Sequence, residues 1–143
     1  MLYSKIVVGY DGSELADRAL QMSIELAKSQ PATEIVVLHA IESVASLSEY
    51  SGFAILSRIE DAKKQGEYIK VKAEKILASI PNRWTLYIVE ERPDKAILQQ
   101  GEKLNADLIV MGSRGLSGVK EFFLGSVSHY VTQHSKIPVL IVK

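Results

Sequence analysis

Residues 107–127, DLIVMGSRGLSGVKEFFLGSV, decide the fold of this chain. The stretch opens with the apolar run 108–111, which is short and β-branched enough to form a buried strand. The run stops at Gly112, and further glycines follow at Gly115, Gly118 and Gly125. An apolar helical pattern begins at about Ser126, so the stretch predicts a strand, a glycine-rich turn and a helix in that order.

This order favours a binding site for an anion. Glycine allows positive φ and lets the backbone approach a ligand closely. Backbone amides in such a turn, together with the N-terminus of a helix, form a nest for anions. The interleaved serines and the guanidinium of Arg114 would complete a phosphate site. The alternative is an ordinary surface loop, and glycine and serine content alone does not decide between the two.

The glycine spacing also carries a resemblance to a known family. Gly112-x-x-Gly115, nine residues, and then Gly125-Ser126 resembles the ATP-binding signature of the universal stress protein family. Three more segments are similar to that family in the expected order, namely residues 6–13 (IVVGYDGS), 37–40 (VLHA) and 137–142 (IPVLIV). The resemblance covers essentially the whole chain, and its glycine spacing is that of the ATP-binding branch.

The resemblance implies a site for an adenine nucleotide, with ATP as the ligand and Mg²⁺ or Mn²⁺ bound through its phosphates. It assigns the adenine end to the turn at Tyr10 and Asp11 and to Ala40. It assigns ribose and phosphates to the glycine-rich loop and the start of the following helix: Gly112, Ser113, Arg114, Gly115, Gly125, Ser126, Val127 and Ser128.

Two of these residues, Asp11 and Tyr10, have alternative roles. The Asp11 carboxylate can accept a hydrogen bond from a ribose hydroxyl or from the adenine amine, or it can cap the first helix or its turn. Tyr10 stands where many members of the family have a smaller residue. Its ring is expected either to stack on the base or to crowd the pocket.

Composition narrows the class of protein. At 143 residues the chain is expected to form a single domain, 1–143. Its 17 basic and 17 acidic residues cancel, so no global field attracts nucleic acid and any anion site is local. The absence of cysteine excludes disulfides and thiolate chemistry. We expect neither a membrane span nor a signal peptide, and hence a cytoplasmic protein.

Hydrophobic patterning predicts five strands that alternate with four helices. Residues 41–55 show no period and are expected to form a long loop. Ser13 is the expected N-cap of the first helix. The expected strands are 5–10, 34–40, 84–89, 108–111 and 139–142, and the expected helices are 14–29, 56–79, 93–104 and 126–134.

This alternation predicts a three-layer α/β/α sandwich around a parallel sheet. The pattern alone leaves two strand orders open, 2-1-3-4-5 and 3-2-1-4-5. The family resemblance implies the second order, that of an adenine nucleotide alpha hydrolase-like fold, and we adopt it. In that order the first and fourth strands are neighbours at a switch point, where ligands bind in open α/β sheets.

Several chemistries lack their sequence signals. The chain has no Walker-type Gly-x-x-x-x-Gly-Lys-Ser/Thr, no Gly-x-Gly-x-x-Gly and no Gly-x-Ser-x-Gly. His39, His129 and His134 do not have metal-ligand spacing. Because no general base is placed, we expect a regulatory, stress-response protein that uses ATP as a ligand with no or very slow hydrolysis. The alternatives are a nucleotide-free dimeric interaction module and, from another class, an ATP-consuming enzyme.

The last strand predicts self-association. Val139–Val142 is apolar and lies at the edge of the sheet in the order adopted. An open apolar edge invites pairing with another chain. In the family a similar strand pairs antiparallel with its twin, so the resemblance implies a homodimer through strand five. The alternative is that these side chains pack only against helices and that a loop covers the edge.

Overall fold

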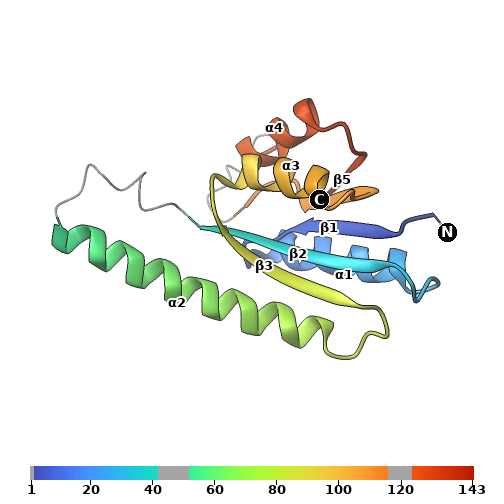
Figure 1. Ribbon diagram of the computed structural model, residues 1–143, viewed down its shortest axis with the longest axis horizontal. Helices are drawn as coiled ribbons and strands as arrows, with labels where there is room; N and C mark the ends of the chain where they lie inside the picture. Colours follow the sequence, from blue (N-terminus) through green and yellow to red (C-terminus); the bar gives the residue numbers. More distant parts are fainter. Residues whose placement is uncertain (1, 42–51, 116–123) are drawn as a thin grey trace.

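The computed structural model describes residues 2–41, 52–115 and 124–143. Within these ranges strands and helices alternate, as the patterning predicted (Figure 1). Their ends lie within two residues of the predicted ends, except at the start of the second helix. The elements are β1 (Lys5–Gly9), α1 (Glu14–Ala27), β2 (Glu34–Ile41), α2 (Gly52–Leu77), β3 (Trp84–Glu90), α3 (Pro93–Lys103), β4 (Leu108–Gly112), α4 (Ser126–His134) and β5 (Val139–Val142).

The prediction of a loop over residues 41–55 is wrong at both of the described ends of this segment. Ile41 belongs to β2, and α2 begins at Gly52 rather than at Leu56. Ile55 explains the earlier start, because it lies four residues before Ile59 and continues the apolar stripe of the helix. The rest of the predicted loop, residues 42–51, lies outside the described residues.

All strand pairs in the described sheet are parallel, and their order is β3-β2-β1-β4-β5. This confirms the order 3-2-1-4-5 and the three-layer α/β/α fold. β1 lies at the centre, where Ile6 pairs with Ile35 of β2 on one side and with Leu108 of β4 on the other. The ends of β1 and β4 therefore meet at the switch point.

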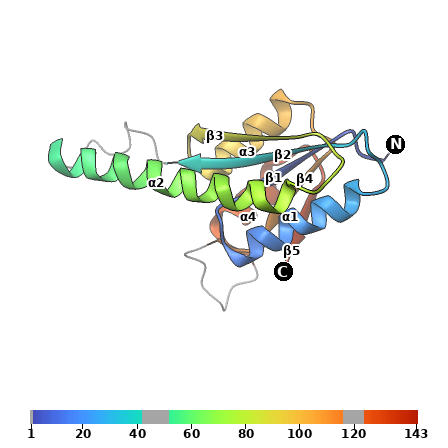
Figure 2. The same ribbon diagram turned by 90° about the horizontal axis from the view of Figure 1, so that it is seen from below.

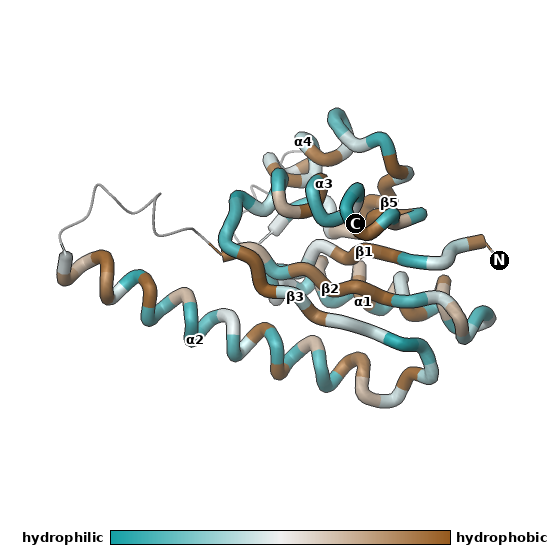
Figure 3. The backbone as a smooth tube through the Cα atoms, viewed as in Figure 1, coloured by the Kyte–Doolittle hydropathy of each residue, from teal (hydrophilic) through white to brown (hydrophobic). Residues whose placement is uncertain are grey.

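Helices cover both faces of the sheet (Figures 1 and 2). On the face of α1 and α2, Ile6 and Val8 of β1 join a first hydrophobic cluster. On the face of α3 and α4, Val7 joins a second cluster. Figure 3 shows the resulting concentration of apolar residues along the central strands. Burial on both faces accounts for the continuous apolar run in β1.

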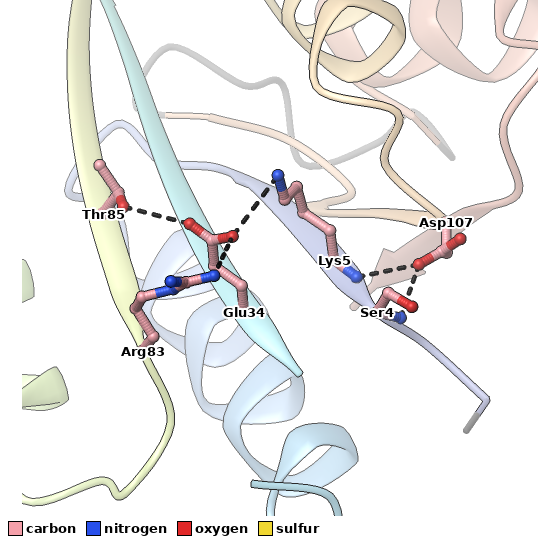
Figure 4. Close-up of polar contacts among 6 residues, drawn as sticks. All are labelled: Ser4, Lys5, Glu34, Arg83, Thr85 and Asp107. Atoms are coloured by element: carbon pink, nitrogen blue, oxygen red, sulfur yellow. Dashed lines mark hydrogen bonds and ion pairs between the residues drawn. The ribbon is translucent and has the colours of Figure 1, made fainter. Parts of the chain in front are cut away.

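Hydrogen bonds and ion pairs to two carboxylates link the N-terminal ends of neighbouring strands (Figure 4). The Oδ2 atom of Asp107 accepts hydrogen bonds from the backbone amides of Ser4 at 2.6 Å and Lys5 at 2.9 Å. The Glu34 carboxylate lies 3.4 Å from Nζ of Lys5 and 3.6 Å from Nη2 of Arg83. These contacts hold β1, β2 and the start of β3 together at the N-terminal ends of the strands, away from the C-terminal ends.

Candidate functional site

A cavity of about 440 Å³ lies at the C-terminal ends of β1, β2 and β4. The turn after β1 forms one wall. The described ends of the glycine-rich loop, residues 112–115 and 124–125, form another together with the start of α4. Of the residues predicted for the site, Ser113 is absent from the described lining. The others all line it: Tyr10, Asp11, Ala40, Gly112, Arg114, Gly115, Gly125, Ser126, Val127 and Ser128.

The structure adds wall residues that the sequence motifs did not single out. Six of them lie within the quoted segments 6–13, 37–40 and 107–127 but were not assigned to the site, namely Gly9, Ser13, Leu38, His39, Met111 and Leu124. Ala16 lies one turn into α1. Pro93 and Ile97 come from α3 and have no local motif of their own. Only the close approach of α3 to the sheet brings these two residues to the cavity, and that approach could not be predicted from their own segment.

Asp11 lies where the turn after β1 meets the loop after β4. Its Oδ1 atom accepts a hydrogen bond from the backbone amide of Ser13 at 2.9 Å. A β-carbon built at Gly115 would lie 2.5 Å from its Oδ2 atom, so the carboxylate lies directly against the glycine-rich loop. Ser13, and not Asp11, caps α1, because Oγ of Ser13 accepts from the amide of Ala16 at 3.1 Å.

The two ends of the glycine-rich loop are bonded to each other. The Gly125 amide donates to the carbonyl oxygen of Ser113 at 2.6 Å. The Ser128 hydroxyl also points at that oxygen, at a distance of 2.7 Å, and lies 3.1 Å from the carbonyl oxygen of Gly125. Ser128 is fully buried, and its hydroxyl hydrogen is used inside the protein. In this arrangement Ser113 and Ser128 hold the two described ends of the loop together.

The start of α4 lies at the wall of the cavity. Gly125 is the N-cap residue and has no side chain that could accept from the first turn. Ser126 and Val127 of this turn line the cavity together with Arg114. A helix N-terminus beside a guanidinium is an electrostatically favourable place for an anion.

Tyr10 places its ring in the core beneath the cavity. The residue is 3% exposed and belongs to the first hydrophobic cluster. Its hydroxyl donates a hydrogen bond to Asp17 of α1. Burial, reinforced by this carboxylate, raises the pKa of Tyr10, so the hydroxyl stays protonated. Because core packing and Asp17 hold both ends of the side chain, the ring is fixed in place.

His39 lines the same cavity and has a defined tautomer. Its Nδ1 atom lies 3.0 Å from the carbonyl oxygen of Tyr10, which can only accept, so Nδ1 carries the hydrogen. Burial lowers the pKa of His39, although the Tyr10 carbonyl and Asp11 act in the opposite direction. The Nε2 atom is therefore a bare acceptor, and it is buried without a hydrogen-bond partner among the described residues.

This burial predicts that the fold loses stability in mild acid. Because the pKa of His39 is lower in the folded than in the unfolded chain, the unfolded chain takes up a proton first as the pH falls below about 6.5. We expect the parent protein to lose more stability between pH 7 and pH 5 than His39→Asn, which keeps a donor for the Tyr10 carbonyl and does not titrate. Urea unfolding of both proteins across this range measures the difference. Parallel pH profiles would contradict the assignment of the effect to His39.

In the ranges 2–41, 52–115 and 124–143, no three acidic, histidine or cysteine side chains lie close enough to hold a metal ion. None of the helices described there is both long enough and apolar enough to cross a membrane.

Comparison with known proteins gives a consistent result. The model of the "Universal stress protein family" matches residues 2–143. The chain is 38% identical to universal stress protein YxiE of Bacillus subtilis, over 99% of this chain and 100% of that protein. The solved structure of MJ0577 superposes with a TM-score of 0.80 at 32% identity, covering 100% of this chain and 97% of the other. MJ0577 is a universal stress protein of Methanocaldococcus jannaschii.

A further solved relative was crystallised with a nucleotide. It is a universal stress protein in complex with cAMP, and it is 27% identical to this chain. Its TM-score is 0.64, and the match covers 99% of this chain and 98% of the other. The similarity therefore extends over nearly the whole length of both chains.

Proposed function

This chain belongs to the universal stress protein family, and from that premise we propose that it is a regulatory stress-response protein that binds ATP as a ligand. The proposal rests mainly on one observation. The turn after β1 and the described ends of the glycine-rich loop after β4 line one cavity, and ten of the eleven residues predicted for nucleotide belong to this lining. The solved relative in complex with cAMP supports an adenine nucleotide as the occupant.

The walls of the cavity offer a group for each part of the nucleotide. Ala40, Leu38 and Ile97 supply apolar surface for the base. The Asp11 carboxylate is an acceptor for a ribose hydroxyl. Arg114 and the amides at the start of α4 would hold the phosphates, and Mg²⁺ or Mn²⁺ would bind through the phosphate oxygens. Gly115 would allow a phosphate to approach the backbone.

The character of the described lining favours ligand binding over rapid turnover. Asp11 is the only carboxylate in that lining, and its Oδ1 atom already accepts from Ser13. His39 is buried, neutral and donates to a backbone carbonyl, so it is poorly placed to exchange protons with bound nucleotide. No lysine is among the described lining residues. We therefore propose that bound ATP persists and is hydrolysed very slowly or not at all.

Titration calorimetry with ATP and GTP tests this function. We expect saturable heat with ATP at micromolar to submillimolar affinity and weaker binding of GTP. Absence of heat at millimolar ATP would favour the nucleotide-free interaction module. Phosphate release in the same samples separates a ligand-binding protein from an enzyme. We expect less than about one turnover per minute, against a typical enzyme rate of about 10 per second.

We also propose that the protein forms a homodimer through β5. The strand is the last in the described sheet, and its four residues are all partly exposed. An edge strand with unpaired backbone groups can pair with its two-fold mate, so that one surface serves both subunits.

A further inference from the structure

Lys72 of α2 reaches from a distant part of the sequence to the turn that carries Asp11. Its Nζ atom donates to the carbonyl oxygen of Gly12 at 2.8 Å. It also forms an ion pair with Oδ2 of Asp17 at 2.9 Å. The hydrogen bond to Asp17 raises the pKa of Lys72, so the amine remains charged.

The peptide bond between Gly12 and Ser13 links this lysine to the cavity. The carbonyl of that peptide accepts from Lys72, and its N–H donates to Oδ1 of Asp11. One rigid planar group is therefore held at its two ends by a cation on α2 and by the carboxylate in the cavity. Gly12 has φ +80°, a conformation that other residues rarely adopt, so the orientation of this peptide depends on the turn.

Lys72 differs from its neighbours on the helix. Lys63, Lys70 and Lys75 have exposed side chains. The side chain of Lys72 is 32% exposed, and its two acceptors both belong to the segment that runs from β1 into α1. The cluster of lysines on α2 is typical of a solvated face, and only the tertiary contact distinguishes this one.

We propose that Lys72 is a positioning residue for the nucleotide site, which acts on Asp11 through the Gly12–Ser13 peptide. By withdrawing electrons from the carbonyl, the ammonium group strengthens the N–H donor that orients the carboxylate. The position of α2 and the affinity for nucleotide are then coupled. This inference rests on the proposed function. A role confined to fastening α2 to α1 would instead require only the ion pair with Asp17.

Four variants separate the two roles by calorimetry with ATP and by melting temperature. Lys72→Met removes both contacts, and we expect it to weaken ATP binding about tenfold, the effect of losing a hydrogen bond to a charged group. Lys72→Arg should restore part of the affinity. Asp17→Asn weakens the ion pair, but it keeps a side-chain oxygen that can accept from the Tyr10 hydroxyl and leaves the Gly12 contact. It should therefore lower the melting temperature with little loss of affinity. Lys75→Met, with the same charge change on the same helix, should alter neither.

The ligand-free protein gives a second readout. The amide resonance of Ser13 in a ¹H–¹⁵N NMR spectrum reports its hydrogen bond to Asp11, and we expect Lys72→Met to shift it more than Asp17→Asn does. A parent protein that does not bind ATP would overturn the proposed function. A parent that binds, with Lys72→Met binding equally well, would overturn only the positioning role. Equal losses of affinity in Lys72→Met and Asp17→Asn would also overturn it, since the ion pair alone would then explain the effect.

Discussion

Gly115→Val and Gly125→Val are each expected to abolish ATP binding at millimolar nucleotide while the protein stays folded. A β-carbon at Gly115 would lie 2.5 Å from Oδ2 of Asp11, closer than β-carbons approach other atoms in proteins. At Gly125 it would lie 3.1 Å from the α-carbon of Arg114, where backbone would have to move. Valine adds two methyl groups beyond that carbon. It would therefore displace the Asp11 carboxylate or the Arg114 backbone and would keep the phosphates of ATP away from the loop backbone.

Calorimetry and far-ultraviolet circular dichroism measure binding and folding in the same samples. Gly52→Val is the matched control, because a β-carbon at Gly52 meets nothing within 4 Å. It makes the same chemical change at a glycine outside the cavity and should bind ATP like the parent. If both loop variants bound ATP with undiminished affinity, the glycine-rich loop could not be the phosphate site.

Ile141→Pro is expected to convert a dimer into a monomer. The carbonyl oxygen of Pro138 accepts from the amide of Ile109 in β4, and that of Val142 accepts from the amide of Ser113, the residue after β4. Since backbone groups alternate in direction along a strand, those of Val139 and Ile141 point outward, away from β4. Proline at residue 141 removes an outward N–H and leaves the contacts with β4 intact, a position in which edge strands tolerate proline.

Sedimentation equilibrium at tens of micromolar provides the measurement. The parent and Ile141→Ala should both sediment at twice the chain mass of 15.8 kDa, and Ile141→Pro at that mass itself. The alanine variant matters because Ile141 also packs against the second hydrophobic cluster. It loses the same side chain but keeps the N–H. A parent protein that sediments as a monomer, with and without ATP, would contradict the dimer directly.

The sequence predicted the elements that its local patterns encode. The apolar run in β1, the Ser13 cap of α1 and Pro93 at the start of α3 each specify a structure within a few residues, and all three are confirmed. The strand order needed the family resemblance, because hydrophobic periodicity says which residues are buried but not which strands are neighbours.

The site could be predicted to the extent that its residues adjoin the motifs. Asp11 and the loop glycines follow strand ends in the sequence, so their meeting at the switch point follows from the fold. The internal use of the Ser128 hydroxyl depends on how the loop closes. The contact between Lys72 and Gly12 joins segments 60 residues apart. No local sequence pattern indicates this contact, so only the three-dimensional structure shows it.

The parallel pairing of β1 with β4 also determines when the site can form. Lys5 and Asp107, at the starts of these strands, are 102 residues apart, and no short hairpin joins any two of the described strands. During synthesis the turn with Asp11 leaves the ribosome long before the glycine-rich loop exists. Contacts between such distant segments carry a high loop-closure cost and form late. Under the proposed function, nucleotide would therefore have no template role in early folding, and we expect it to stabilise the completed chain by slowing unfolding.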